Sequence, residues 1–177
     1  MLPLLIEMPR LFERFLQRLL EERLPGAGLS VRWGHERRHL DLDQTVALEP
    51  DMVICRHGSP VCIGDAKYKP TGWDEAQQSV EDARASRNAD VYQMLAYCTG
   101  YGVRDAVLIY PQPSGRETIS IDTGSGLKRV HSLGIDLTGG GAEFEAACER
   151  LADMVAAVAD QQQPAAHESV SAQSGWG

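Results

Sequence analysis

The sequence predicts a single α/β domain in which helices pack on a mixed β-sheet. Three observations predict it: an amphipathic helix opens the chain, short apolar runs bounded by glycine and proline follow, and two further helical segments interrupt and close that series. A length of 177 residues suits one domain with a proper core and is short for two.

The first half of the chain predicts a helix, a strand and a β-hairpin. Residues 10–23 repeat apolar side chains at three- and four-residue spacing until Pro25-Gly26 ends the helix. The segments that follow are a strand at Leu29–Trp33, a polar stretch to Ala47, and strands at Met52–Arg56 and Val61–Tyr68 joined by residues 57–60.

The second half predicts two helices and two strands. Its segments are a polar surface excursion at 70–88, a helix from about Ala89 to Thr99, strands at Ala106–Tyr110 and Thr118–Ile121, and a helix from about Ala142 to Asp160. Residues 161–177 are polar and rich in Ala, Ser and Gln, which predicts a disordered tail after a domain of residues 1–160.

A formal net charge of −8 argues against binding of nucleic acid through bulk positive charge. The charge is uneven, because residues 1–40 carry seven Arg and five Glu, a net +2, and the rest of the chain is −10. We therefore expect a DNA-facing surface to involve the first helix with Arg32, Arg37 and Arg38.

The four cysteines show no CxxC pair and no zinc-type spacing, so we expect buried, reduced thiols; they are Cys55, Cys62, Cys98 and Cys148. The apolar start is too short to span a membrane and has no cleavage signal. These features predict a soluble, cytoplasmic protein.

Two acids and a lysine are candidates for one site on the predicted hairpin. Asp65 and Lys67 are two residues apart on a strand, so they point to the same face. Pairing of Arg56 with Pro60 would place Asp51 directly across from Asp65. A shift by one residue would turn Asp51 to the other face. A shared site therefore requires a three-residue loop or a β-bulge.

Two converging carboxylates repel each other, and a hard cation such as Mg²⁺ relieves that repulsion. The cation also neutralises a scissile phosphate and activates water. Lys67 has three open roles: it orients the water, helps to deprotonate it, or stabilises the charge on pentacovalent phosphorus. The set predicts metal-dependent phosphodiester cleavage with Mg²⁺, for which Mn²⁺ can substitute.

Glu13 is the preferred candidate for an additional acid. It shares a helical row with Leu16 and Leu20, at the edge of the buried stripe. A rim carboxylate paired with a nearby Arg is an equal alternative, and Glu7 and Glu36 are weaker rivals.

Gln93 and Tyr97 are four residues apart and project from one face of the predicted helix. An amide and a phenol there can hold phosphate or base edges, or steady a catalytic water. The spacing is common, so a structural role is the alternative for this pair.

The ordered segments together resemble a known family. They are residues 6–15, Pro50–Ile54, Asp65–Lys69 and Asp90–Tyr97, followed by the strand-like Val107–Pro111. The set is similar to the PD-(D/E)xK nuclease superfamily and, within it, to the nuclease domain of the McrC family, the cleavage subunits of McrBC 5-methylcytosine restriction systems. The resemblance covers roughly residues 5–113.

The resemblance implies a restriction-endonuclease-like fold and a Mg²⁺-dependent DNA endonuclease. By position in the motifs, its site residues are Asp51, Asp65, the Ala66 backbone carbonyl and Glu13 as metal ligands, Lys67 as the catalytic lysine, and Gln93 and Tyr97 as the remaining members.

The implied partners are DNA and an McrB-like GTPase motor, since the 177 residues contain no GxxxxGK[ST] phosphate loop. Cutting both strands requires two sites, which favours a homodimer. Family members carry a region ahead of the nuclease domain, whereas the first helix here begins near Met1. That difference implies a shortened or separately encoded domain, or different coupling to the motor. The alternatives are a stand-alone nuclease in DNA repair or mobile-element processing, and a non-catalytic docking module for an NTPase.

Overall fold

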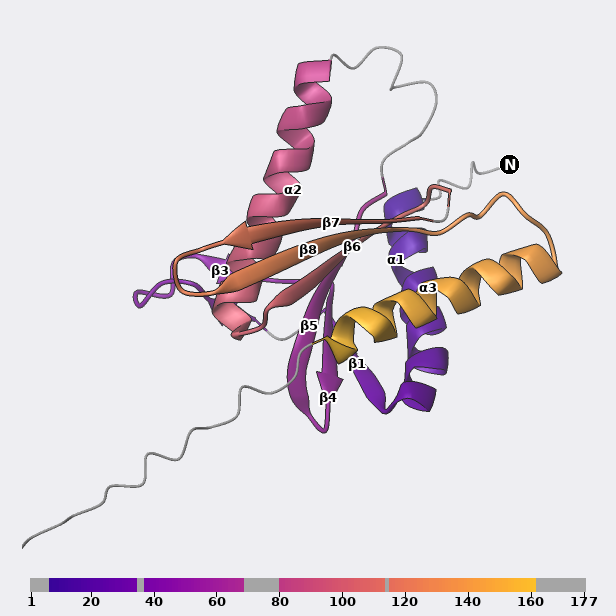
Figure 1. Ribbon diagram of the computed structural model, residues 1–177, viewed down its shortest axis with the longest axis horizontal. Helices are drawn as coiled ribbons and strands as arrows, with labels where there is room; N and C mark the ends of the chain where they lie inside the picture. The colour runs from indigo at the N-terminus through magenta and orange to yellow at the C-terminus, as the bar shows by residue number, and fades with distance from the viewer. Residues whose placement is uncertain (1–6, 35–36, 69–79, 114, 162–177) are drawn as a thin grey trace, which may run out of the picture.

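A mixed six-stranded sheet lies at the centre of the protein, with α1 and α3 on one side and α2 on the other (Figure 1). The computed structural model describes residues 7–34, 37–68, 80–113 and 115–161. The helices are α1 (Met8–Arg23), the 3-10 turn η1 (Leu24–Ala27), α2 (Val80–Tyr101) and α3 (Ala142–Asp160). The strands are β1 (Leu29–Trp33), β2 (Arg38–His39), β3 (Ala47–Leu48), β4 (Met52–Arg56), β5 (Ser59–Ala66), β6 (Asp105–Tyr110), β7 (Gly115–Asp122) and β8 (Leu127–Gly134).

The order of strands in the sheet is β1-β4-β5-β6-β8-β7. The central strands β5, β6 and β8 are parallel, and the outer pairs are antiparallel. This arrangement confirms the predicted α/β class, and it brings the carboxyl ends of β5 and β6 to one edge of the sheet.

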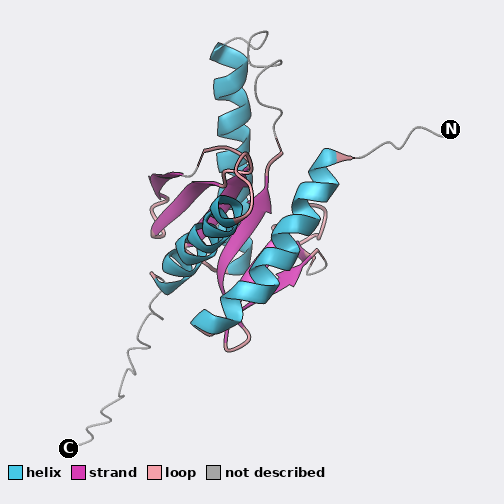
Figure 2. Cartoon of the chain, turned by 90° about the vertical axis from the view of Figure 1, so that its right-hand side faces the viewer, coloured by secondary structure: helices cyan, strands magenta, loops and turns pink. Residues whose placement is uncertain are grey.

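Each face of the sheet has its own apolar core. Leu16 and Leu20 of α1 pack with Leu151 and Val155 of α3 on one face, and Figure 2 shows these two helices side by side. The opposite face packs against α2. All four cysteines are buried and free, as the sequence predicted.

Helix α2 begins much earlier than the sequence predicted. Residues 80–88 were expected in a polar surface excursion, but they form its first turns, and residues 70–79 of that predicted excursion lie outside the described residues. The start of α2 projects beyond the sheet (Figure 1), and Glu81, Arg84 and Arg87 there are exposed. An exposed helical segment has no apolar face to bury, so no hydrophobic period marked it in the sequence.

Strand β8 was missed, and β7 is longer than the predicted Thr118–Ile121. The polar residues Arg129 and His131 interrupt the apolar pattern of β8, yet His131 is fully buried. Both contact buried Asp105: Arg129 Nε donates to its Oδ1 at 2.6 Å, and His131 Nε2 lies 3.0 Å from the same atom. Asp105 on the neighbouring β6 therefore explains how β8 can hold polar residues in the interior, which the alternation of apolar residues in the sequence does not reveal.

The short pair β2–β3 lies in the stretch that the sequence predicted only as polar. The predicted helix at 142–160, the strand at 29–33 and the first helix are confirmed, the last beginning two residues earlier. The predicted disordered tail falls, after Gln161, outside the described residues. Within the described ranges, every helix is too short or too polar to cross a bilayer.

Candidate active site

Asp65 and Lys67 lie at the carboxyl end of β5, on the face that packs against α2. The Lys67 N–H donates to the Ile109 carbonyl at 2.9 Å, so the extended backbone continues one residue past the strand. Their side chains consequently point the same way, and Lys67 Nζ lies 2.6 Å from Asp65 Oδ2. The predicted neighbourhood of acid and ammonium is confirmed.

A β-bulge brings Asp51 to the same end of the sheet. The β4–β5 hairpin turns through two residues, His57 and Gly58, with φ of 49° and 79°, the left-handed values of a type I′ turn. The register then shifts by one between Ile54 and Cys55.

The shift leaves Val61 unpaired, and the ladder continues to Met52 opposite Gly64. Its next position sets Asp51 across from Asp65. Of the two geometries that the sequence allowed, the protein uses the bulge. Asp51 Oδ2 also accepts the Ala66 N–H at 2.8 Å, which fixes the carboxylate beside β5.

Burial disfavours the charged form of both carboxylates, and the charge of Asp51 adds to this effect at Asp65. Asp65 is 4% exposed. Burial and then the neighbouring Asp51 raise its pKa to about 6, although Lys67 opposes the shift. Burial likewise raises the pKa of Asp51, against the Ala66 hydrogen bond. Each acid is thus held near another acid at an energetic cost, an arrangement typical of functional sites.

Lys67 is held as a cation. Burial lowers its pKa, but the hydrogen bond to Asp65 and the charges of Asp65, Asp90 and Asp51 raise it further, so the net shift is upward. Its Nζ also donates to Gln93 Oε1 at 2.8 Å. The ammonium is therefore fixed by groups from both β5 and α2.

Gln93 and Tyr97 lie against Lys67, which the sequence spacing alone did not specify. Gln93 Nε2 donates to the Tyr97 hydroxyl at 2.9 Å, and that hydroxyl donates to the Glu49 carbonyl at 3.1 Å. Burial raises the pKa of Tyr97, so its phenol stays protonated at neutral pH. The pair links α2 to the chain just before Asp51.

Glu13 of α1 faces the site from the other side of the sheet. It is half-buried, and burial followed by the charge of Asp51 raises its pKa, against the opposing effect of Arg10. Its rival Glu7 is exposed and paired with Arg10 at 2.9 Å, and Glu36 lies outside the described residues. The pKa of Glu13 responds to the charge of Asp51, so Glu13 stays the preferred candidate for the further acid.

Asp90 and Tyr110 border the site but were not among the predicted site residues. Asp90 is 9% exposed, its Oδ1 lies 3.8 Å from Lys67 Nζ, and its Oδ2 accepts the Tyr110 hydroxyl at 3.3 Å. The spacing of Asp90, Gln93 and Tyr97 at i, i+3 and i+7 places all three on one helical face. That spacing was the signal available in the sequence.

The donor set suits a hard divalent cation. The hydrogen bonds described for the two aspartates engage Oδ2 of each and leave Oδ1 of each to a ligand. The Ala66 carbonyl lies on the same side of β5 as its N–H, toward Asp51. Over the described ranges, no three His, Cys, Asp or Glu side chains form a preassembled cluster. Mg²⁺ is commonly bound by one or two carboxylates plus water, so the residues present fit it.

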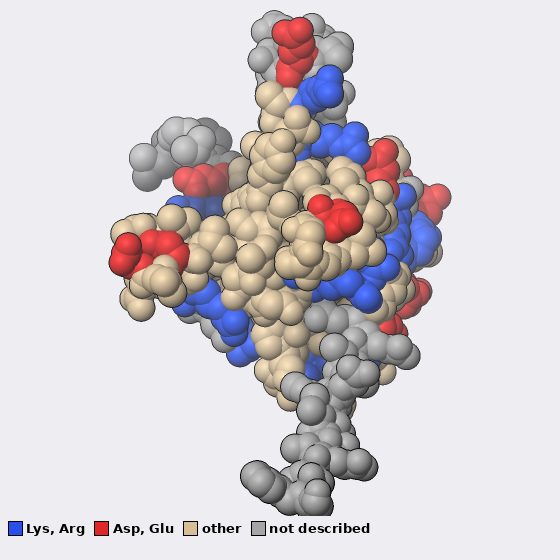
Figure 3. Space-filling view, turned by 60° about the vertical axis from the view of Figure 1, so that its left-hand side comes forward, with Lys and Arg blue, Asp and Glu red and all other residues tan. Residues whose placement is uncertain are grey.

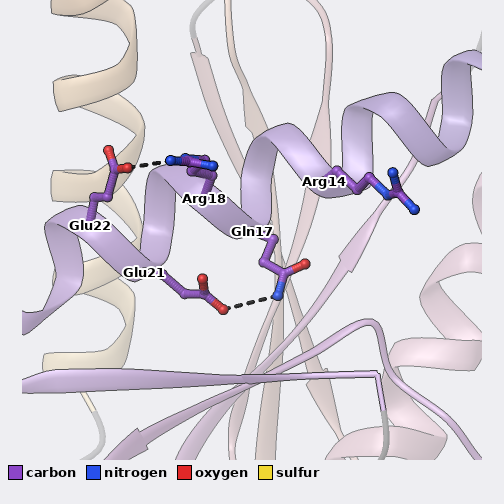
Figure 4. A pocket seen from close by; sticks show the side chains of 5 residues that line it. All are labelled: Arg14, Gln17, Arg18, Glu21 and Glu22. Carbon is purple, nitrogen blue, oxygen red and sulfur yellow. Dashed lines mark hydrogen bonds and ion pairs between the residues drawn. The ribbon is translucent and has the colours of Figure 1, made fainter.

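The surface charge is mixed. On the face shown in Figure 3, Lys and Arg side chains are dispersed among Asp and Glu. The exposed face of α1 forms an open hollow of about 500 Å³ (Figure 4), lined by Arg14, Gln17, Arg18, Glu21 and Glu22. There Gln17 donates to Glu21 at 3.0 Å and Arg18 to Glu22 at 3.4 Å. Because these groups pair along the helix, the hollow adds little net positive charge for a polyanion.

Comparison with known proteins supports the assignment of the fold. The family described as "McrBC 5-methylcytosine restriction system component" matches residues 1–111. The fold is similar to that of a chain in the solved structure of a Thermococcus gammatolerans assembly of McrB AAA+ hexamers with bound McrC, with a TM-score of 0.55 and 19% sequence identity. The match covers 85% of this chain and 34% of that chain, so this chain spans about a third of its length. No curated protein sequence matches.

Proposed function

Because the chain belongs to the family of McrBC 5-methylcytosine restriction system components, we propose that it is the Mg²⁺-dependent DNA endonuclease part of such a system. The observation that carries the proposal is the meeting of Asp51, Asp65 and Lys67 at the end of β5, where Asp65 Oδ2 and Lys67 Nζ are 2.6 Å apart. Two neighbouring acids whose pKa values are both raised, beside a half-buried ammonium, have little structural purpose without a ligand.

Asp51 and Asp65 would hold the cation, with the Ala66 carbonyl and Glu13 as further oxygen donors. Bound Mg²⁺ would supply positive charge that neutralises the scissile phosphate and activates water. Asp51 is steadied for this role by the Ala66 N–H, at 2.8 Å from its Oδ2. Mn²⁺, which also takes oxygen ligands, should substitute.

Lys67 acts as a cation in this proposal. Its pKa is raised by Asp65 in spite of burial, so the amine is protonated at neutral pH and is a poor general base. Of the three roles open from the sequence, we favour orienting the attacking water and stabilising charge on the phosphate. Gln93 holds the ammonium at 2.8 Å, and Tyr97 holds Gln93 at 2.9 Å.

The proposed substrate is DNA and the proposed partner is an McrB-like GTPase motor. The motor is suggested by the solved assembly of McrB AAA+ hexamers with bound McrC, because one chain of that assembly has a fold similar to that of this protein. With a net charge of −8, the chain should depend on other subunits for much of its DNA affinity. Homodimerisation would supply the second site for a double-strand cut.

The test is cleavage of methylated and unmethylated plasmid by the purified chain, with Mg²⁺ or EDTA, and with or without a motor partner and GTP. We expect cleavage that requires Mg²⁺ and is abolished in Lys67→Ala. Lys128→Ala is the matched control, since Lys128 lies at the opposite end of the sheet and donates to the Val103 carbonyl at 2.7 Å. Normal cutting by Lys67→Ala would refute the assignment.

The same assay separates the two alternatives. Cleavage of plain DNA without a partner would favour a stand-alone nuclease of repair or mobile-element processing. No cleavage in any combination, with the motor bound, would favour a docking module. Binding of Mg²⁺, measured as a shift in melting temperature, should persist in Lys67→Ala because that residue is not a ligand.

A further inference from the structure

Among the described residues, three side-chain oxygens lie near the Lys67 ammonium, and they are not equivalent. Asp65 Oδ2 at 2.6 Å and Gln93 Oε1 at 2.8 Å are within hydrogen-bond distance. Asp90 Oδ1 at 3.8 Å is an ion-pair partner just beyond that distance. The Lys67 ammonium therefore contacts the Asp65 carboxylate directly, and the Asp90 carboxylate lies close enough to replace it.

Asp65 has two proposed roles that compete for one negative charge, because its Oδ2 contacts Lys67 and its Oδ1 is left to the cation. As a proposed metal ligand, its carboxylate faces a divalent cation, which attracts it more strongly than a single ammonium does. Lys67 is only 20% exposed, and a buried charge needs a compensating partner. Asp90 is the remaining carboxylate within 4 Å of Lys67 in the described part of the chain.

Asp90 is anchored independently of the metal site. Its Oδ2 accepts the Tyr110 hydroxyl of β6 at 3.3 Å, while Oδ1 faces Lys67. A carboxylate that only fastened α2 to the sheet would need no ammonium beside its second oxygen. No group of three acidic, His or Cys side chains is assembled for a metal in the described ranges, so neither Asp90 nor Glu13 completes a preassembled set of ligands with Asp51 and Asp65.

From this geometry we propose that Asp90 is a positioning residue, which retains the Lys67 ammonium in the site when Asp65 engages the cation. The inference rests on the proposed function. The new element is the assignment of separate roles. Asp51 and Asp65 bind the cation, whereas Asp90 and Gln93 hold the Lys67 ammonium in position.

The decisive measurement is the rate at which an amine-acetylating reagent modifies Lys67, read by peptide mass spectrometry with Mg²⁺ or EDTA. Wild-type Lys67 should react slowly in both conditions. In Asp90→Asn, Mg²⁺ should raise its reaction rate several-fold, because neither carboxylate then holds the ammonium. Glu81→Gln, an exposed change on the same helix, is the matched control, and Lys128 is the internal reference.

Tyr110→Phe is the second variant, which removes the Tyr110 hydrogen bond to Asp90 Oδ2 without removing the carboxylate and should give a smaller Mg²⁺-dependent increase. Equal Mg²⁺ effects on Lys67 in wild type and both variants, or no effect in any of them, would overturn the proposal. So would loss of Mg²⁺ binding in Asp90→Asn, which would make Asp90 a ligand.

Cleavage kinetics give a further readout. Asp90→Asn should lower kcat by on the order of 10²-fold, the cost of a misplaced catalytic group, with KM for DNA unchanged and partial recovery in Asp90→Glu. A wild-type chain that binds Mg²⁺ but cuts nothing would end the nuclease proposal and leave the labelling test of Asp90 intact. A fall in melting temperature of Asp90→Asn with unchanged labelling and kcat would mark a structural role and refute positioning.

Discussion

Replacing Asp65 with Asn should stabilise the metal-free protein while abolishing cleavage. Asp65 is 4% exposed, and burial with the nearby Asp51 raises its pKa from 3.8 to about 6. Each pKa unit corresponds to about 1.36 kcal/mol, so ionising Asp65 in the folded protein costs about 3 kcal/mol at neutral pH. Asn has nearly the same shape and carries no charge, so it removes that cost.

The sign of the pH dependence follows from the upward shift. The folded protein binds the Asp65 proton more tightly than the unfolded chain does, so the associated stability is present below pH 3.8 and is lost as pH rises through about 6. The advantage of Asp65→Asn over wild type should therefore be about 3 kcal/mol at pH 7.5, about half of that at pH 5, and about a fifth of it at pH 4. The pKa of about 6 already includes the contact with Lys67 that the variant loses.

The assay is urea denaturation of both proteins in EDTA across that pH range, followed by a repeat with Mg²⁺. Asp153→Asn, an exposed change on α3, is the control and should alter stability little at any pH. With Mg²⁺, wild type should gain stability and Asp65→Asn should not. A variant less stable than wild type at pH 7.5 in EDTA would refute the reasoning, because it would mean that ionised Asp65 stabilises the folded protein.

Three further predictions concern the surroundings of the site. Asp105→Asn should cost about 3–5 kcal/mol, since it leaves the Arg129 charge without its buried partner; denaturation should detect this, with Mg²⁺ still stabilising the variant. Tyr97→Phe removes the hydroxyl that joins Gln93 to the Glu49 carbonyl, so kcat should fall by roughly tenfold with unchanged Mg²⁺ affinity, and an unchanged kcat would count against the link. Gly64→Ala should destabilise by about 1–3 kcal/mol in a thermal melt, because its Cβ would lie 2.5 Å from Met52 Cγ; a neutral result would mean that Met52 moves aside.

The sequence predicted the proximity of Asp65 and Lys67 better than it predicted the elements around them. Asp65 and Lys67 were assigned to one face because strand alternation is a local property, and the structure places them in contact. Strand β8 and the first turns of α2 were not predicted, since neither carries an uninterrupted apolar pattern. In β8, buried His131 is matched by Asp105, which is 26 residues away, and no local window contains that partnership.

The residues that could form a site, and the two registers that would bring Asp51 to it or away from it, were determined by the sequence alone. Periodicity is set by backbone geometry, so it is readable residue by residue. The tertiary structure decided which register forms, because it places a bulge at Val61. The tertiary structure also decided that Gln93 and Asp90 enclose Lys67. The position of α2 over the sheet is set by packing of its buried side chains against β5 and β6. Such packing depends on residues distant in the chain, and only the folded protein brings them together.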